Sequence, residues 1–344
     1  MSSAAISDEE IARRDLVVIG ASAGGVDTLI RVVAGLPADL AATVCIVLHI
    51  APSSPSALAH ILQRAGCLPC RQARDEEPLR TGEILVAPPD HHLVIEDRRV
   101  RLDAGPRENG HRPAVNVLFR SAAAVRGGRV IGVILSGTRD DGTAGLAAIK
   151  SHGGGTIVQD PDEALYPGMP ASALAHVAAD AVVPSSEIAG AIVRMVGGAD
   201  PPADPKADTT KVERDPGGGI ISTCPECGGV LTKRLEAGVP QWRCRVGHRY
   251  SPESLADAQA TNVEGALWGA VRALKDRGAL LERMAEQAED QGVARSARRL
   301  RHEARDAREQ AEVVRRTIEH AVRDSLRLVG EDGADDAVDA EVSA

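Results

Sequence analysis

Short runs of valine and isoleucine alternate with Ala- and Leu-rich segments of helical spacing between Asp15 and about Met195. This alternation is typical of β-α-β units, in which helices cover both faces of a parallel sheet. We therefore predict an α/β fold with a doubly wound, mostly parallel sheet. The segment 91–103 interrupts the rhythm and predicts a β-hairpin inserted after the third strand. The predicted strands are residues 15–20, 43–50, 83–89, 129–137, 155–160 and 180–184.

The rest of the chain divides by composition. Residues 196–219 hold much Pro, Gly and Asp but little apolar surface, which predicts a flexible linker after a catalytic domain at 15–195. Residues 220–250 form a small cysteine-containing unit. Apolar residues then recur at spacings of four and three over 254–329, which predicts a helical hairpin or a coiled coil. The acidic tail at 330–344 is predicted to be disordered.

The apolar seam of this helical region favours two helices with a break at Gly292. Pairing within one chain, a homodimer and a separate partner helix all satisfy such a seam, so the three alternatives stay open. In the first helix the seam is predicted to run through Ala260, Val263, Leu267, Ala270, Leu274, Leu281, Met284 and Ala288. In the second it is predicted to run through Val293, Ala297, Leu300, Ala304, Ala307, Ala311, Val314, Ile318 and Ala321.

Composition excludes several classes of protein. No apolar run approaches the roughly 18 residues that cross a bilayer, so the chain is not expected to span a membrane. The first residues lack a basic leader and an apolar stretch, so we expect a cytoplasmic protein. A net charge of -9 and only one Phe, two Trp and two Tyr argue against binding nucleic acid through a basic face or aromatic stacking.

A glycine-rich turn, Gly20-Ala21-Ser22-Ala23-Gly24, lies between the first predicted strand and a helix that begins near Gly25. A tight turn in this position can lift a serine hydroxyl clear of the backbone, and the helix start offers N–H groups to an anion. A phosphate or nucleotide cradle is the alternative. Against it, the turn is not G-x-G-x-x-G, and His49 rather than an acidic residue ends the second strand.

Two further residues belong with this serine. His49 ends the second predicted strand, and Asp141 follows the strand at 129–137. Because the carboxyl ends of parallel strands meet at one edge of the sheet, Ser22, His49 and Asp141 are predicted to converge as nucleophile, base and orienting carboxylate. Two alternatives stay open, namely that Asp140 is the histidine's partner and that Asp141 caps the following helix.

The segment 15–195 resembles the catalytic domain of the chemotaxis protein-glutamate methylesterases, the CheB family. The resemblance runs through IGASAGG, VLHIAPS, APPDHHL, HRPAVNVLF, LSGTRDDGTAGL and QDPDEALYPGMPASA. It implies hydrolysis of methyl esters on receptor glutamates, and in some members deamidation of receptor glutamines. It also implies that Ser22, His49 and Asp141 form the triad, that no catalytic cofactor is needed, and that a methylated receptor or other signalling protein is the substrate.

The sequence departs from the family in two respects. Ala23 stands where members usually carry Thr, and Thr138 and Arg139 stand where they carry Met and Gly. No receiver domain is expected before the first strand, so control by phosphorylation within the chain is not expected. These departures leave a second hypothesis open, a catalytically inactive signalling adaptor that uses its cysteine unit and helices.

The cysteine unit carries two short ligand pairs, Cys224 with Cys227 and Cys244 with His248. Such pairs, each on a turn and joined by a hairpin, predict a Cys3His zinc ribbon, whose closed coordination would make the metal structural. The alternative is a reduced Cys-x-x-Cys and an unrelated histidine. Cys67 and Cys70 share the spacing but lack a second pair, so we interpret them as ordinary thiols.

Overall fold

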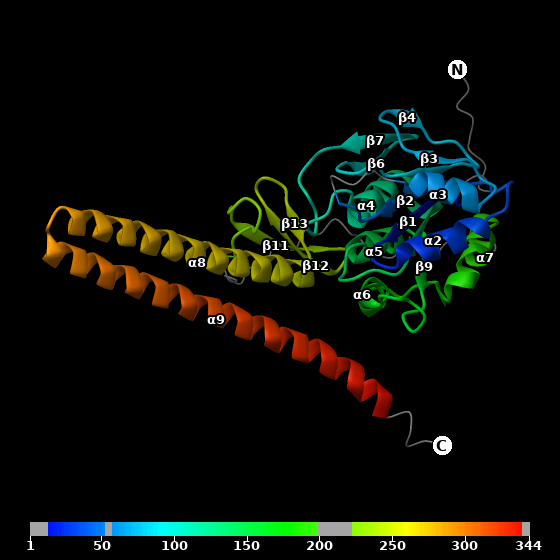
Figure 1. Cartoon of the computed structure of the whole chain (residues 1–344). Coiled ribbons are helices and arrows are strands. Elements are labelled where there is room, and N and C mark those ends of the chain that lie inside the picture. The colour runs from blue at the N-terminus through cyan, green and yellow to red at the C-terminus, as the bar shows by residue number, and fades with distance from the viewer. Residues whose placement is uncertain (1–12, 52–56, 199–221, 339–344) are drawn as a thin grey trace. The chain divides into compact units, whose positions relative to one another are not determined.

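The computed structural model describes residues 13–51, 57–198 and 222–338, with side chains described up to residue 320. The chain divides into two compact units, Met1–Ala256 and Asp257–Ala344. Figure 1 shows the sheet and its helices in the first unit and two long helices in the second.

A seven-stranded parallel sheet of order β10-β9-β8-β1-β2-β5-β3 forms the centre of the first unit. β1, β2, β8 and β9 are rich in Val and Ile and buried along their whole length, as expected for a parallel sheet covered on both faces. The predicted fold class is confirmed. The strands are β1 (Leu16–Ala21), β2 (Thr43–Leu48), β3 (Cys70–Gln72), β5 (Ile84–Val86), β8 (Val130–Ile134), β9 (Gly155–Gln159) and β10 (Ala181–Val183).

Several strands are shorter than predicted, and one was not predicted. β2 ends at Leu48 rather than at residue 50, and β8 ends at Ile134 rather than at residue 137. β5 ends at Val86 rather than at residue 89, because Pro88 and Pro89 have no N–H to donate to a neighbouring strand. β3 was not predicted as a strand. Its three residues at the sheet edge are too few to show a period of two.

Helices cover both faces of the sheet (Figure 1). One face packs against α2 (Gly25–Ala34), α3 (Leu58–Ala65) and α7 (Ser185–Val196). The other packs against α4 (Val115–Arg126), α5 (Thr143–Ser151) and α6 (Gly168–His176). Alternation along each strand divides the core in two, since Val17 and Ile19 point to the first layer and Leu16 and Val18 to the second.

Two small antiparallel sheets complete the first unit. β4 (Glu77–Pro78), β6 (His92–Glu96) and β7 (Arg99–Asp103) contain the predicted hairpin, in the order β4-β7-β6. β11 (Leu231–Glu236), β12 (Val239–Cys244) and β13 (Arg249–Tyr250) form the cysteine-containing sheet, which we call the ribbon. A short 3-10 turn, η1 (Gly127–Arg129), precedes β8.

The boundaries around the ribbon differ from the prediction. We expected residues 220–250 to form a unit of their own, but the first compact unit extends to Ala256 and includes them. The ion pair of Glu236 on β11 with Arg120 explains this, because it connects the ribbon to α4. Beyond Gly198 the predicted linker lies outside the described residues.

The second unit is formed by α8 (Pro252–Asp290), which begins just before it, and α9 (Ala294–Val338). Gly292, at the predicted break, has a φ of 77° between the two helices. α8 and α9 run antiparallel, since Arg301 pairs with Glu289 and, about two turns further along α9, Arg308 pairs with Glu282. The buried apolar cluster between them contains Leu281, Ala285, Leu300 and Ala304.

Part of the predicted seam in α8 was wrong. Val263 is 60% exposed and Met284 is 45% exposed, and Ala285 is buried in place of Met284. Neighbouring helix positions point about 100° apart, and in an Ala-rich helix the sequence pattern does not decide between them. The predicted disordered tail needs a second correction, because α9 continues to Val338. A formed helix gains one hydrogen bond for each residue it adds, so α9 extends into the acidic segment. Residues 339–344 lie outside the described residues.

Within the described ranges, no helix is both long enough and apolar enough to cross a membrane.

Candidate active site

The three predicted site residues lie at the carboxyl edge of the sheet. Ser22 follows β1, His49 follows β2, and Asp141 comes after β8. β1 pairs with β2 on one side and with β8 on the other, so the three side chains start from adjacent strands. This is the position where connections leave the sheet in opposite directions, which opens a crevice in doubly wound folds.

Hydrogen bonds connect the three side chains in series. His49 Nδ1 lies 3.1 Å from Ser22 Oγ, and His49 Nε2 lies 2.7 Å from Asp141 Oδ2. An ionised carboxylate only accepts, so Nε2 must carry the proton that it donates to Asp141. The lone pair of Nδ1 then faces the hydroxyl of Ser22. This tautomer places a base directly beside the serine.

Asp141 is 2% exposed and is surrounded by donors. Its Oδ2 also accepts the N–H of Val115 at 2.7 Å, and its Oδ1 accepts from Asn109 Nδ2 at 3.1 Å and from the N–H of Asn116 at 3.3 Å. Burial alone would raise the pKa of Asp141. The hydrogen bond and charge of His49, with the N–H of Val115, outweigh burial and lower this pKa to about 2.

The two alternatives for Asp141 are not what the structure contains. The carboxylate of Asp140 accepts the hydroxyls of Ser251 and Ser254. The N-cap of α5 is Gly142, and Asn116 Oδ1 accepts its N–H at 3.1 Å. Asp141 is thus the residue bonded to His49.

Glycines and one serine hold the turn at Ser22. Gly24 has a φ of 71°, a left-handed conformation that L side chains rarely adopt. Ser136 Oγ donates to the carbonyl of Ala23 at 2.9 Å and accepts the N–H of Tyr166 at 3.0 Å. A Cβ on Gly137 would come within 2.8 Å of the Cβ of Ser22, so glycine is needed for this close approach.

A cavity of about 410 Å³ opens beside Ser22 and His49. The ring of His111 lies parallel to the ring of His49 with their centroids 3.7 Å apart. Burial lowers the pKa of His111 to about 4, and the charge of His49 acts in the same direction. The lining residues are Ser22, Ala23, His49, Ile50, Ala51, Arg107, Gly110, His111 and Arg112.

Sequence reasoning did not identify His111 or Asn109 as site residues. Both belong to Glu108-Asn109-Gly110-His111, in which Asn-Gly is a strong signal for a tight turn but not for a place in the fold. Ala23, one of the departures from the resembled family, lines the cavity.

Comparison with known proteins places this site in a family. The model of the CheB methylesterase domain matches residues 17–192, which is about half of the chain. The chain belongs to the CheB methylesterase family. All three residues of the hydrogen-bonded series lie within the matched segment.

Relatives in this family share the same part of the chain. A protein-glutamate methylesterase/protein-glutamine glutaminase of Symbiobacterium thermophilum is 41% identical over 185 residues, which cover 54% of this chain and 51% of that protein. A putative protein-glutamate methylesterase/protein-glutamine glutaminase of Leptospira interrogans is 36% identical over 182 residues, covering 53% of this chain and 94% of that protein. This chain spans about half the length of the first relative.

A solved structure agrees with this assignment. The CheB methylesterase catalytic domain of Thermotoga maritima superposes with a TM-score of 0.51 at 32% identity, covering 53% of this chain and 98% of that one. The ribbon and the long helices therefore lie outside the part of the chain that the CheB domain explains.

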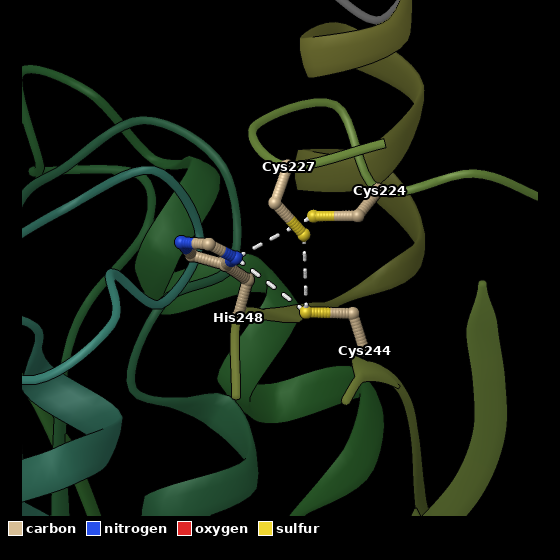
Figure 2. Close-up of side chains that lie close together, drawn as sticks. All are labelled: Cys224, Cys227, Cys244 and His248. Atoms are coloured by element: carbon tan, nitrogen blue, oxygen red, sulfur yellow. Dashed lines mark hydrogen bonds between the residues drawn. The ribbon is translucent and has the colours of Figure 1, made fainter. Parts of the chain in front are cut away.

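A second cluster of chemically active side chains lies in the ribbon. Figure 2 shows Cys224, Cys227, Cys244 and His248 pointing toward one another, and their ligand atoms all lie within 4.8 Å of one another. Cys227 Sγ is 3.7 Å from Cys244 Sγ, and His248 Nδ1 is 3.6 Å from Cys224 Sγ and 3.5 Å from Cys244 Sγ.

These separations fit a tetrahedral metal. Zinc binds sulfur at about 2.3 Å and nitrogen at about 2.0 Å. At tetrahedral angles, two sulfur ligands are then about 3.8 Å apart, and a sulfur and a nitrogen are about 3.5 Å apart. The far nitrogen of His248, Nε2, lies 3.1 Å from Glu226 Oε2. A carboxylate behind the histidine is the usual partner of a metal-binding imidazole, because it fixes the ring with its other nitrogen toward the metal.

Proposed function

We propose that this protein is a serine hydrolase that removes methyl esters from glutamate side chains of a signalling receptor. The observation that carries the proposal is the series of hydrogen bonds from Ser22 through His49 to Asp141. Two relatives in the same family bear the name of this activity. The cavity beside Ser22 would admit the ester side chain.

The geometry supports an acyl-enzyme mechanism. Ser22 Oγ would attack the ester carbonyl carbon while His49 Nδ1 takes the hydroxyl proton, and Asp141 would stabilise the resulting imidazolium. Backbone N–H groups at the start of α2 would bind the oxyanion, since the first turn of a helix lacks partners for its N–H groups. His49 then returns the proton to the departing methoxide, and methanol leaves.

Hydrolysis of the acyl-enzyme completes the cycle. Water would enter the cavity, and His49 Nδ1 would take its proton as its oxygen attacks the glutamyl carbonyl. The proton returns to Ser22 Oγ as the new acid is released, and it ionises to the glutamate carboxylate. The same acyl-enzyme would form from a glutamine side chain with ammonia as the leaving group, which would account for the double name of the relatives.

The two other hypotheses from the sequence receive less support. A nucleotide cradle would leave His49 without a role, whereas the structure bonds it to Ser22. An inactive adaptor would have no need for a buried, ionised Asp141 aligned with a histidine.

Methanol release from a methylated receptor fragment tests the proposal. We expect the intact chain to release methanol, and Ser22→Ala and His49→Ala to release none above background. Ser151→Ala and His152→Ala are matched controls, because both residues lie at or just beyond the end of α5, away from the site, and should leave the rate unchanged. Equal rates in Ser22→Ala and the intact chain would contradict the proposal.

For the ribbon we propose a structural zinc ion held by Cys224, Cys227, Cys244 and His248. Four protein ligands leave no open position for catalysis, so the ion would stabilise a segment with little core of its own. Its support is the tetrahedral spacing and the carboxylate behind His248. Cysteines that bind zinc instead of forming disulfides are typical of a reducing compartment, so we propose that the protein works in the cytoplasm.

We propose that α8 and α9 pair within one chain. Their shared apolar cluster and the ion pairs across it support this alternative over a homodimer. Light scattering should then give the mass of a monomer. A dimer that dissociates when residues 254–329 are deleted would contradict it.

A further inference from the structure

A tight turn connects the ribbon to the Ser22–His49–Asp141 series. Glu108 and His111 exchange backbone hydrogen bonds of 3.2 and 2.9 Å. Asn109 and Gly110 between them have φ angles of 52° and 77°, as a two-residue type I′ turn requires. The turn carries Asn109 to Asp141 and His111 to the ring of His49, so it touches two of the three residues.

Backbone groups of the ribbon and of the residue after it bind Asn109 in this turn. The N–H of Asn109 donates to the carbonyl of Arg249 at 2.8 Å. The N–H of Ser251 donates to Asn109 Oδ1 at 2.9 Å. Asn109 and Ser251 are each only 2% exposed, so water does not compete for these bonds.

The bond from Ser251 decides which way the Asn109 amide faces. An amide has one accepting oxygen and one donating nitrogen. Because the oxygen is taken by the N–H of Ser251, the nitrogen is left to donate to Asp141 Oδ1. The reversed amide would place its oxygen against the carboxylate of Asp141 and its NH₂ group against the N–H of Ser251, and both contacts would be repulsive.

Two further groups of contacts hold the ribbon and the residues after it against the same region. Arg120 on α4 pairs with both Glu108 of the turn and Glu236 of β11, and Glu236 pairs with Arg249 at 2.5 Å. The hydroxyls of Ser251 and Ser254 donate to Asp140 Oδ1 at 2.5 and 2.9 Å. The segment after β13 therefore binds Asp140 directly and Asp141 through Asn109.

We infer that the ribbon and the residues that follow it position the carboxylate of Asp141, with Asn109 as the positioning residue. The inference rests on the proposed function and deepens it. It gives a role at the site to the ribbon, which lies outside the family match at 17–192. A folded ribbon would hold the Asn109 amide toward Asp141. Loss of the ribbon would free the amide and let the carboxylate and His49 leave their alignment.

The expected size of the effect follows from the bond that is lost. A hydrogen bond to a charged group contributes about 1.5–3 kcal/mol, which corresponds to roughly 10- to 100-fold in rate. Asp141 keeps three other donors, so we expect about a 10-fold loss of kcat for Asn109→Gly with KM unchanged. Glycine accepts the positive φ at this position, so the variant deletes the side chain without straining the turn.

A double-mutant cycle with the ribbon tests the connection. Cys244→Ser should lower kcat by a similar factor, and the double variant Asn109→Gly with Cys244→Ser should be no slower than either single variant. Cys67→Ser is the matched control, since Cys67 is exposed and lies outside both sites. Multiplied losses in the double variant would show that the ribbon acts only through general stability and would overturn the inference.

The pH profile of a second variant separates positioning from folding. Asn109→Asp keeps the acceptor for Ser251 but sets a second carboxyl beside Asp141, whose charge raises the pKa of the introduced group. Once protonated, that carboxyl can donate as the amide does. We expect the deficit in kcat to shrink as the pH falls from about 8 to about 6, and a deficit independent of pH would overturn the inference.

A spectroscopic measurement on the full chain keeps the inference testable if the proposed function fails. With ¹⁵N-labelled histidine, the Nε2 proton of His49 should be protected and shifted downfield by Asp141. Asn109→Gly should weaken that protection, and Cys244→Ser should do the same. The proposed function fails if the intact chain releases no methanol. The positioning role is overturned separately if the Nε2 signal of His49 is unchanged in both variants.

Discussion

The hydrogen-bonded series takes its side chains from three strand ends, with Ser22 and His49 27 residues apart and His49 and Asp141 92 residues apart. The cysteine and histidine cluster takes all four of its side chains from two turns within residues 224–248. The first site exists only when the whole sheet has formed. The second is nearly defined by its own short segment, but that segment lacks a core large enough to hold it.

The two sites also differ in how their polar groups are satisfied. Asp141 has hydrogen bonds from both side chains and backbone, so its geometry is complete without any added ion. In the cluster, three sulfurs and a ring nitrogen face one another, and a cation would turn this crowded arrangement into favourable bonds. One site is organised by the fold, and the other would help to organise its own part of the fold.

Removing the nucleophile is the strongest way to separate the two sites. Ser22→Ala should reduce kcat by roughly 10⁶-fold, because losing the nucleophile costs about as much as losing the whole triad. It should leave the zinc content and the melting temperature as they are. Methanol release, elemental analysis and calorimetry on one preparation would check this. A simultaneous loss of zinc would contradict the picture of two separately built sites.

Asp141→Asn should lower kcat by less than Ser22→Ala does, by roughly 10⁴-fold. The amide would turn its NH₂ group toward His49, so Nε2 would have to accept, and this favours the tautomer with a proton on Nδ1. That nitrogen could then no longer accept from Ser22. ¹⁵N shifts of the His49 ring would show the change of tautomer, and a retained Nε2–H with full activity would contradict the role given to Asp141.

Metal removal should act mainly on stability. Chelation, or Cys224→Ser, should lower the free energy of unfolding of the ribbon by on the order of 10 kcal/mol. Calorimetry should show the loss, elemental analysis should give about one zinc per intact chain, and Cys67→Ser should match the intact chain in both. Through Asn109 the same treatment should lower kcat about 10-fold, far less than Ser22→Ala.

Acid should produce the smallest of these effects. The pKa of Asp141 is lowered to about 2, against about 3.9 for a free Asp, so its ionisation contributes about 2–3 kcal/mol of stability. A lowered pKa means that this contribution is complete above about pH 5 and is lost as the pH falls from 4 toward 2. Urea unfolding across this range should show a steeper decline for the intact chain than for Asp141→Asn. Parallel declines would contradict the low pKa.

Much of the Ser22–His49–Asp141 site could be predicted because the carboxyl ends of parallel strands lie at one edge of the sheet. Apolar runs mark β1, β2 and β8, and the residues just after them share one edge of the sheet. Ser22, His49 and Asp141 followed from that rule and from the family motifs around them. The spacing of Cys224, Cys227, Cys244 and His248 is local information of the same kind, since turns of fixed length bring such pairs together.

The sequence by itself thus determined the parallel sheet, the edge where its polar residues gather and the four grouped ligand residues. Only the tertiary structure decided that Asn109 faces Asp141 and that His111 stacks on His49. It also decided that the N–H of Ser251 binds the side chain of Asn109, 142 residues away in the chain. The physical reason is that these contacts depend on where a turn and a ribbon pack against the sheet. Periodicity and spacing specify elements, but the partners of a buried amide are chosen by packing between elements that are distant in the chain.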